Sequence, residues 1–138
     1  MAVIETSIEI NSAPEKVWEV VSDIDNEPKF WRGTKKVRNI SKEGNIVIRE
    51  IIIAFRDQKC LQEVTLHPKE KIVAVFTKGI INGSKTIKLS PHGDKTLLDV
   101  KWDVQLSGLM GMFTGMIKKH IKSGTDLALQ SIKEELER

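Results

Sequence analysis

Residues 11–33 read NSAPEKVWEVVSDIDNEPKFWRG and contain two helix starts in succession. Ser12, followed three residues later by Glu15, forms a capping box, and Pro14 between them suits the first helical turn. The apolar residues that follow recur at three- and four-residue spacings, which predicts a short amphipathic helix. They are Val17, Trp18, Val20, Val21 and Ile24.

The second start lies in residues 25–33, where acidic residues and a proline precede the aromatic pair Phe30 and Trp31. This pattern predicts a second short helix or helical turn that ends at Gly33. Before both helices, residues 2–10 place isolated apolar side chains among polar ones. They therefore predict a first strand with one buried face.

From Thr34 onward the pattern changes to strands separated by tight turns. The separators KEGN, HPKEK, GIING and PHGD are hairpin-length clusters of Gly, Pro, Asn and Asp. We expect successive strands to pair antiparallel as a meander, with Asn82-Gly83 as one hairpin turn. The predicted strands are residues 35–40, 45–55, 58–66, 71–77, 84–89 and 95–106.

The last predicted strand, residues 95–106, alternates most clearly. Thr96, Leu98, Val100, Trp102, Val104 and Leu106 should share one face. Residues 45–55 and 71–77, by contrast, are apolar on both faces. This predicts either additional cover on the outer face of the sheet or a surface for self-association.

A long helix is predicted for residues 109–136, because apolar side chains recur there at helical spacing. At 1.5 Å per residue it would be roughly 40 Å long, enough to cross a sheet. It begins in the segment LSGLMGMFTGMIKK, residues 106–119, whose glycines each cost about 1 kcal/mol of helix propensity relative to Ala. We interpret this segment as a yielding lid whose methionines offer adaptable apolar surface.

Length and charge favour one domain spanning residues 1–138, with a formal net charge of +3. The N-terminus lacks the features of a secretory signal, and the single cysteine, Cys60, fits a reducing compartment, so a cytoplasmic location is expected. Basic residues are interspersed with acidic ones, which argues against nucleic-acid binding. The apolar part of residues 106–119 is shorter than the roughly 20 residues of an integral membrane segment.

Neither a catalytic nor a metal site is predicted from motifs. GIINGSKT, residues 79–86, approaches a phosphate-binding loop, but Ser84 replaces its second glycine and a strand follows instead of a helix. His67, His92 and His120 are widely separated, without metal-ligand spacing. We expect no catalytic residue, metal or cofactor.

The helical region also carries a family resemblance. A first strand leading into A-P-E-x-V-W, and then D-I-D-N-x-P-x-F-W, resembles the START-like or Bet v 1-like (SRPBCC) superfamily. Within it, the sequence is most similar to the polyketide cyclase/dehydrase and lipid-transport group that includes coenzyme-Q-binding proteins. The residues that carry the resemblance are Ala13, Pro14, Glu15, Val17, Trp18, Ser22, Asp23, Ile24, Asn26, Pro28, Phe30, Trp31 and Gly33.

The resemblance implies an α+β helix-grip fold, in which a curved antiparallel sheet of about seven strands wraps a long C-terminal helix. Two short helices after the first strand close one end. A cavity between sheet and helix would then bind a hydrophobic small molecule, such as a lipid, an isoprenoid quinone or a polyketide-like aromatic. The expected activity is binding or transport.

The candidate pocket residues come from three regions. Trp31 is either at the pocket entrance or a core anchor, and the mid-strand residues Phe76 and Trp102 are either cavity wall or core. Either Arg49 or Glu50 must point inward, because they are neighbours in a strand. On the helix, the candidates are Met112, Phe113, Met116 and His120.

Two other functions remain open at this stage. A cyclase- or dehydratase-type enzyme would use His120 and the inward member of the Arg49/Glu50 pair as acid or base. A protein-interaction module, related to ribosome or chaperone binding, or a homodimer would use the strands that are apolar on both faces. Basic residues at 35–38 and 118–122 form either a solvated surface or a rim for transient contact with anionic lipid headgroups.

Overall fold

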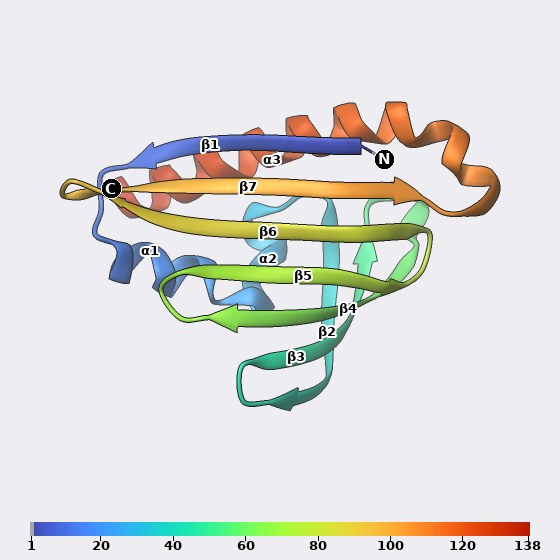
Figure 1. Ribbon diagram of the computed structural model, residues 1–138, viewed down its shortest axis with the longest axis horizontal. Coiled ribbons are helices and arrows are strands. Elements are labelled where there is room, and N and C mark those ends of the chain that lie inside the picture. Colours follow the sequence, from blue (N-terminus) through green and yellow to red (C-terminus); the bar gives the residue numbers. More distant parts are fainter. Residues whose placement is uncertain (1) are drawn as a thin grey trace.

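Seven antiparallel strands form one curved sheet in the computed structural model, which describes residues 2–138 (Figure 1). The strands are β1 (Ala2–Ile10), β2 (Thr34–Glu43), β3 (Ile46–Ile53), β4 (Lys59–His67), β5 (Lys71–Lys78), β6 (Ile81–His92) and β7 (Lys95–Leu106). Their order across the sheet is β1-β7-β6-β5-β4-β3-β2. Strands β2 to β7 therefore form the predicted meander, and β1 pairs with the last strand.

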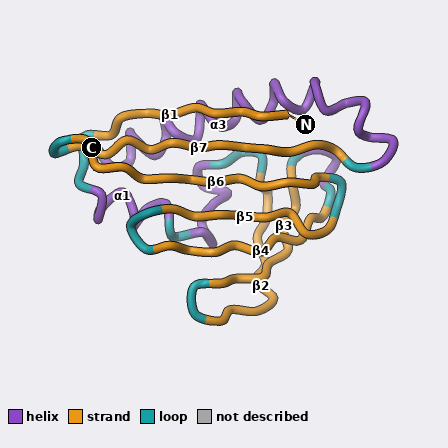
Figure 2. The backbone as a smooth tube through the Cα atoms, viewed as in Figure 1, coloured by secondary structure: helices purple, strands orange, loops and turns teal. Residues whose placement is uncertain are grey.

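Three α-helices and three short 3-10 segments make up the other regular elements of residues 2–138. The helices are α1 (Pro14–Val21), α2 (Glu27–Phe30) and α3 (Thr114–Glu137). The 3-10 segments are η1 (Ile24–Asn26), η2 (Phe55–Asp57) and η3 (Gly108–Phe113). In Figure 1, α3 runs along β1 and β7, and Figure 2 shows how short the loops between the long strands are.

The α+β helix-grip architecture is thus confirmed, including the order of strand, short helices, six strands and long helix. The alternation predicted for β7 is also confirmed. Thr96, Leu98 and Val100 are fully buried, and α3 buries Ala128, Leu129 and Ile132 against the same core. One face of the sheet and one stripe of α3 therefore make the core that positions the site.

The capping box predicted at Ser12 is wrong. Ala13 is the N-cap of α1, with an extended backbone (φ −68°, ψ 151°) and no side-chain cap. The cause is Pro14 at the first helical position, because the residue before a proline is driven out of the helical region. Helix α1 therefore begins one residue later than the capping box requires.

The hairpin turn predicted at Asn82-Gly83 is also wrong, because Gly83 lies inside β6 between Phe76 of β5 and Val104 of β7. A Cβ atom at Gly83 would lie 2.0 Å from the carbonyl oxygen of Asp103, and its φ is +121°. Glycine at this position lets β6 and β7 approach each other closely, and it does not form a turn. As a result β6 starts at Ile81, and Lys85 lies well inside it.

The outer face of the sheet carries exposed apolar side chains, including Ile46 on β3 and Val75 on β5. No helix among residues 2–138 covers that part of the sheet. Self-association or protein interaction through this face stays a prediction. Within the same residues, no helix is long and apolar enough to cross a membrane.

Candidate ligand-binding site

A cavity of about 390 Å³ lies between the concave face of the sheet and α3. Strands β2 to β7 and the end of α2 supply one wall, and the middle of α3 supplies the other. Most of the lining is apolar. The large apolar residues are Trp31, Ile51, Ile53, Phe55, Phe76, Ile81, Trp102, Ile117 and Ile121.

Three aromatic side chains form one wall of this cavity. The rings of Trp31 and Trp102 meet edge to face with centroids 6.4 Å apart, and Phe76 stacks on Trp102 at the same separation. The indole N–H of Trp102 donates a hydrogen bond to Thr125 Oγ1 on α3 at 3.0 Å. This bond satisfies the partly buried indole and joins β7 to the helix.

A cluster of polar side chains lies beside the cavity, and Arg49 is its most buried member. Its strand neighbours Val47 and Ile51 are buried on the same face, so the pleat directs the guanidinium inward. Arg49 Nε donates to Gln62 Oε1 at 2.9 Å from the opposing position on β4, and Nη1 donates to the carbonyl of Ile24 at 3.0 Å. Glu50 points outward and pairs with Arg38 at 3.4 Å.

Glu27, in the first turn of α2, is the anion that compensates Arg49. Arg49 Nη2 donates to Glu27 Oε1 at 2.6 Å, and the Thr34 hydroxyl donates to Oε2 at 2.7 Å. Burial alone would raise the pKa of Glu27. The positive charges of Lys85 and Arg49, with the hydrogen bonds from Thr34 and Arg49, outweigh burial and lower this pKa to about 2.

Lys85 is the second buried cation, with 5% of its surface exposed. It projects from β6 opposite Trp102, and its ammonium lies 3.3 Å from the centroid of the Trp31 ring and 4.9 Å from that of Trp102. Burial lowers the pKa of Lys85 to about 8, although the negative charge of Glu27 opposes this shift. The side chain therefore remains mostly protonated at neutral pH.

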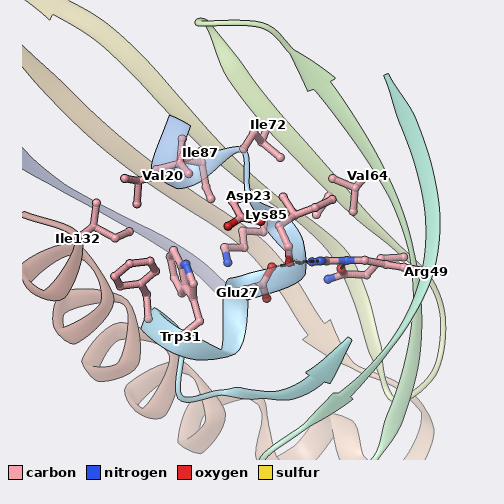
Figure 3. Close-up of a pocket in the computed structure, with 15 residues that line it drawn as sticks. Val20, Asp23, Glu27, Trp31, Arg49, Val64, Ile72, Lys85, Ile87 and Ile132 are labelled. Atoms are coloured by element: carbon pink, nitrogen blue, oxygen red, sulfur yellow. Dashed lines mark hydrogen bonds and ion pairs between the residues drawn. The ribbon is translucent and has the colours of Figure 1, made fainter. Parts of the chain in front are cut away.

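A second cavity of about 30 Å³, room for about one water molecule, lies next to the first beneath α1 and α2. Figure 3 shows the residues around it, with the Lys85 ammonium between the Trp31 ring and the Glu27 carboxylate. Glu27, Trp31, Gln62 and Lys85 line both cavities. These four residues therefore separate the large cavity from the small one.

The eight residues predicted for the pocket are only partly brought together. Trp31, Phe76, Trp102 and His120 line the large cavity, and Arg49 lines the small one. Met112, Phe113 and Met116 are 80%, 40% and 47% exposed and lie outside both linings. These three residues belong to the η3 segment and the first turn of α3, on the solvent side of the helix start.

The opening of the large cavity is marked by residues that line it and are also exposed. These include Arg56 in η2 and His120 on α3. Arg56 has a left-handed backbone (φ +55°) and lies against the Phe55 ring. The opening thus lies between η2 and α3.

Three residues of the site, Glu27, Gln62 and Lys85, were not identified from the sequence. For Lys85 a signal existed, because it is in phase with the buried residues Ile81, Ile87 and Leu89 on β6. The predicted strand, residues 84–89, already contains Lys85, Ile87 and Leu89, so this phase is present in the sequence. Glu27 instead matched an ordinary acidic helix start, and no local pattern marks it.

The donor set does not resemble a metal centre. Among residues 2–138, no three His, Cys, Asp or Glu side chains lie close enough together to hold a metal ion. Glu27 already accepts hydrogen bonds from Arg49 and Thr34. The arrangement is a mostly apolar cavity with a buried cation, Lys85, in its wall.

The sequence matches the family model described as polyketide cyclase / dehydrase and lipid transport over residues 1–137. No curated protein matches the chain. Several solved structures share the fold. The protein TTHA0849 from Thermus thermophilus superposes with a TM-score of 0.83 at 13% identity, covering 98% of this chain and 97% of its own.

Two further structures have similar scores. The Zhui aromatase/cyclase from Streptomyces sp. R1128 gives a TM-score of 0.80 at 15% identity, covering 99% of this chain and 94% of its own. A START superfamily protein from Mycobacterium smegmatis gives 0.77 at 18% identity, with 98% and 97% covered. At these identities the similarity establishes the fold alone.

Proposed function

We propose, on the premise that this chain belongs to the polyketide cyclase/dehydrase and lipid-transport family, that it binds and carries a hydrophobic small molecule in its large cavity. The observation that carries the proposal is the cavity of about 390 Å³ between sheet and α3. Its volume and mostly apolar lining are typical of small-molecule sites. A lipid, an isoprenoid quinone or a polyketide-like aromatic would suit such a chamber.

The distribution of polar groups supports an amphipathic ligand over a pure hydrocarbon. Apolar side chains from β3, β5, β7 and α3 make up most of the lining, whereas Lys85 on β6 and Gln62 on β4 supply polar groups. A ligand with an apolar body and one polar group would contact both regions. We expect the apolar body to lie against Phe76, Trp102 and Ile117.

The first test asks whether the cavity holds a ligand. Purification under native conditions followed by native mass spectrometry should show a bound small molecule, and apolar ligands from a lipid and quinone panel should raise the melting temperature by mass action. The proposal would be contradicted if the purified protein contained no bound small molecule and no member of the panel raised its melting temperature.

A cavity-filling variant gives a sharper test. Gly124 lines the cavity from α3, and a Cβ atom added there meets nothing within 4 Å. Gly124→Leu should therefore fold normally, and its side chain should occupy ligand volume. We expect at least about tenfold weaker binding by isothermal titration calorimetry.

Gly115→Leu is the matched control, because Gly115 lies in the same helix, has equally open surroundings and does not line the cavity. Both substitutions remove a helical glycine, so both should gain about 1 kcal/mol of helix propensity. Equal ligand affinity in the two variants would place the binding site elsewhere.

Catalysis is the second candidate function, and one observation favours it. Lys85 and His120 are among the titratable side chains that line the cavity in which a carbonyl compound would bind. Either group has a suitable chemistry for general acid or base catalysis. Incubating the protein with a bound ligand and measuring the ligand mass afterwards separates the candidates, because a carrier returns its ligand unchanged.

A further inference from the structure

The Lys85 ammonium lies beside the Glu27 carboxylate but is not hydrogen-bonded to it. Within residues 2–138 it forms no hydrogen bond and no ion pair, and its close neighbours are the faces of Trp31 and Trp102. A lysine ammonium has three N–H donors, and aromatic faces satisfy its charge only in part. Lys85 lines both the large cavity and the small one, so its remaining donors can reach an acceptor placed there.

The nearby carboxylate is already engaged by other groups. Glu27 accepts from Arg49 at 2.6 Å and from Thr34 at 2.7 Å. Each of the three guanidinium nitrogens of Arg49 in turn donates one hydrogen bond, to Gln62, the Ile24 carbonyl or Glu27. The buried cluster therefore holds two cations and one anion, and Lys85, the cation without a hydrogen bond, borders the large cavity. The exposed Asp23 lines only the small cavity.

A second donor faces the same space. The side-chain oxygen of Gln62 accepts from Arg49, which orients its amide nitrogen away from the guanidinium. Among the described residues this nitrogen has no acceptor, although Gln62 is buried, with 2% exposed, and lines the cavity. Two donors from the same sheet thus remain available to an acceptor that the protein does not supply.

We propose that the ligand carried in the large cavity is a hydrophobic carboxylic acid, whose carboxylate binds the Lys85 ammonium and the Gln62 amide. This inference rests on the proposed function and names the ligand class of the same site. A single carboxylate would pair with this second cation, and burying a charge is favourable only when it is paired and hydrogen-bonded. The exposed Arg56 at the opening adds positive charge along the path of an entering acid.

The test compares ligands that differ only in the acidic group. Dodecanoate and dodecanol share one chain length, and calorimetry at pH 7 should show about ten- to hundredfold tighter binding of the acid by the wild-type protein. Naphthoate and naphthalenemethanol, as a second pair, distinguish an aromatic acid from an aliphatic one. Preference for the acid in either pair supports the proposal.

Variants of Lys85 test whether this residue causes the preference for the acid over the alcohol. Lys85→Met should bind acid and alcohol with equal affinity, because the ammonium that favours the carboxylate is gone. Lys85→Gln provides a polar second variant, and it should show the same loss. Lys88→Met is the matched control on β6, because Lys88 is exposed on the outer face and its replacement should leave the preference intact.

The outcomes separate this inference from the function on which it rests. Alcohols that bind the wild-type protein as tightly as the acids would overturn the carboxylate proposal and leave hydrophobic binding in place. A preference that survives in both Lys85 variants would overturn it as well. Failure of every acid and alcohol to bind would overturn the proposed function and the ligand class together.

Discussion

The buried pair of Glu27 and Arg49 makes the stability of this protein dependent on pH. The pKa of Glu27 is about 2 in the folded protein, against an ordinary value of 4.5. Between these values the unfolded chain binds a proton that the folded chain does not. The stability contributed by Glu27 is therefore present above pH 4.5 and is lost as the pH falls toward 2.

We predict that Glu27→Gln lowers the free energy of unfolding by roughly 3 kcal/mol at pH 7, because it leaves Arg49 buried without its anion. The difference from the wild type should shrink as the pH falls from 4.5 to 2, where wild-type Glu27 also becomes neutral. Urea unfolding across this pH range measures both effects.

Glu135→Gln is the control for this comparison. It removes the surface pair between Glu135 and Lys29, whose N–O distance is 3.0 Å and whose lysine is 60% exposed. Solvent screens such a pair, so the variant should unfold much like the wild type at pH 7. A Glu27→Gln deficit that stays constant down to about pH 2 would contradict the assigned role.

At the scale of elements, η3 and the start of α3 form an exposed apolar tip, made of Leu109, Met112, Phe113 and Met116. Gly108, at the start of η3, has a left-handed backbone with φ +56°. The tip does not line the cavity, but α3 continues from it into Ile117, His120 and Ile121, which do. A movement of the tip would therefore move one wall of the cavity.

We predict that Met112→Ala changes the rate of ligand release more than it changes the melting temperature. The side chain is 80% exposed, so its loss should cost little folding energy. Stopped-flow release measurements and thermal unfolding give the two quantities. Leu127→Ala is the control, being 47% exposed on α3 but away from the tip. Unchanged release in Met112→Ala would exclude a gating role.

At the scale of the whole molecule, the sequence allowed the helix-grip architecture and its element order to be predicted. Strong periodic signals explain this success, since alternation in β7 and helical spacing in α3 each extend over many residues. The polar cluster was not predictable in the same way. Glu27, Arg49 and Lys85 come from α2, β3 and β6, and only the folded sheet brings them together.

We predict that the chain does not fold cooperatively without residues 114–138. Helix α3 contributes Ile117, Ala128, Leu129 and Ile132 to the core, and its removal would expose the concave face of the sheet. Circular dichroism during urea titration should show no cooperative transition for the shortened chain. Adding a peptide of residues 114–138 should restore one; a cooperative transition without the peptide would show that α3 is dispensable for folding.

Because the first strand pairs with the last, the sheet cannot be completed until most of the chain has been synthesised. Ala2 pairs with Val104, and the carbonyl of Glu9 and the amide of Asn11 are bound by Lys133 and Glu137 near the end of α3. While the chain emerges from the ribosome, β1 has no sheet partner until β7 has been made. The apolar face of β1 therefore lacks its native sheet partner until residues 95–106 have been made, and the contacts of Glu9 and Asn11 with α3 form later still.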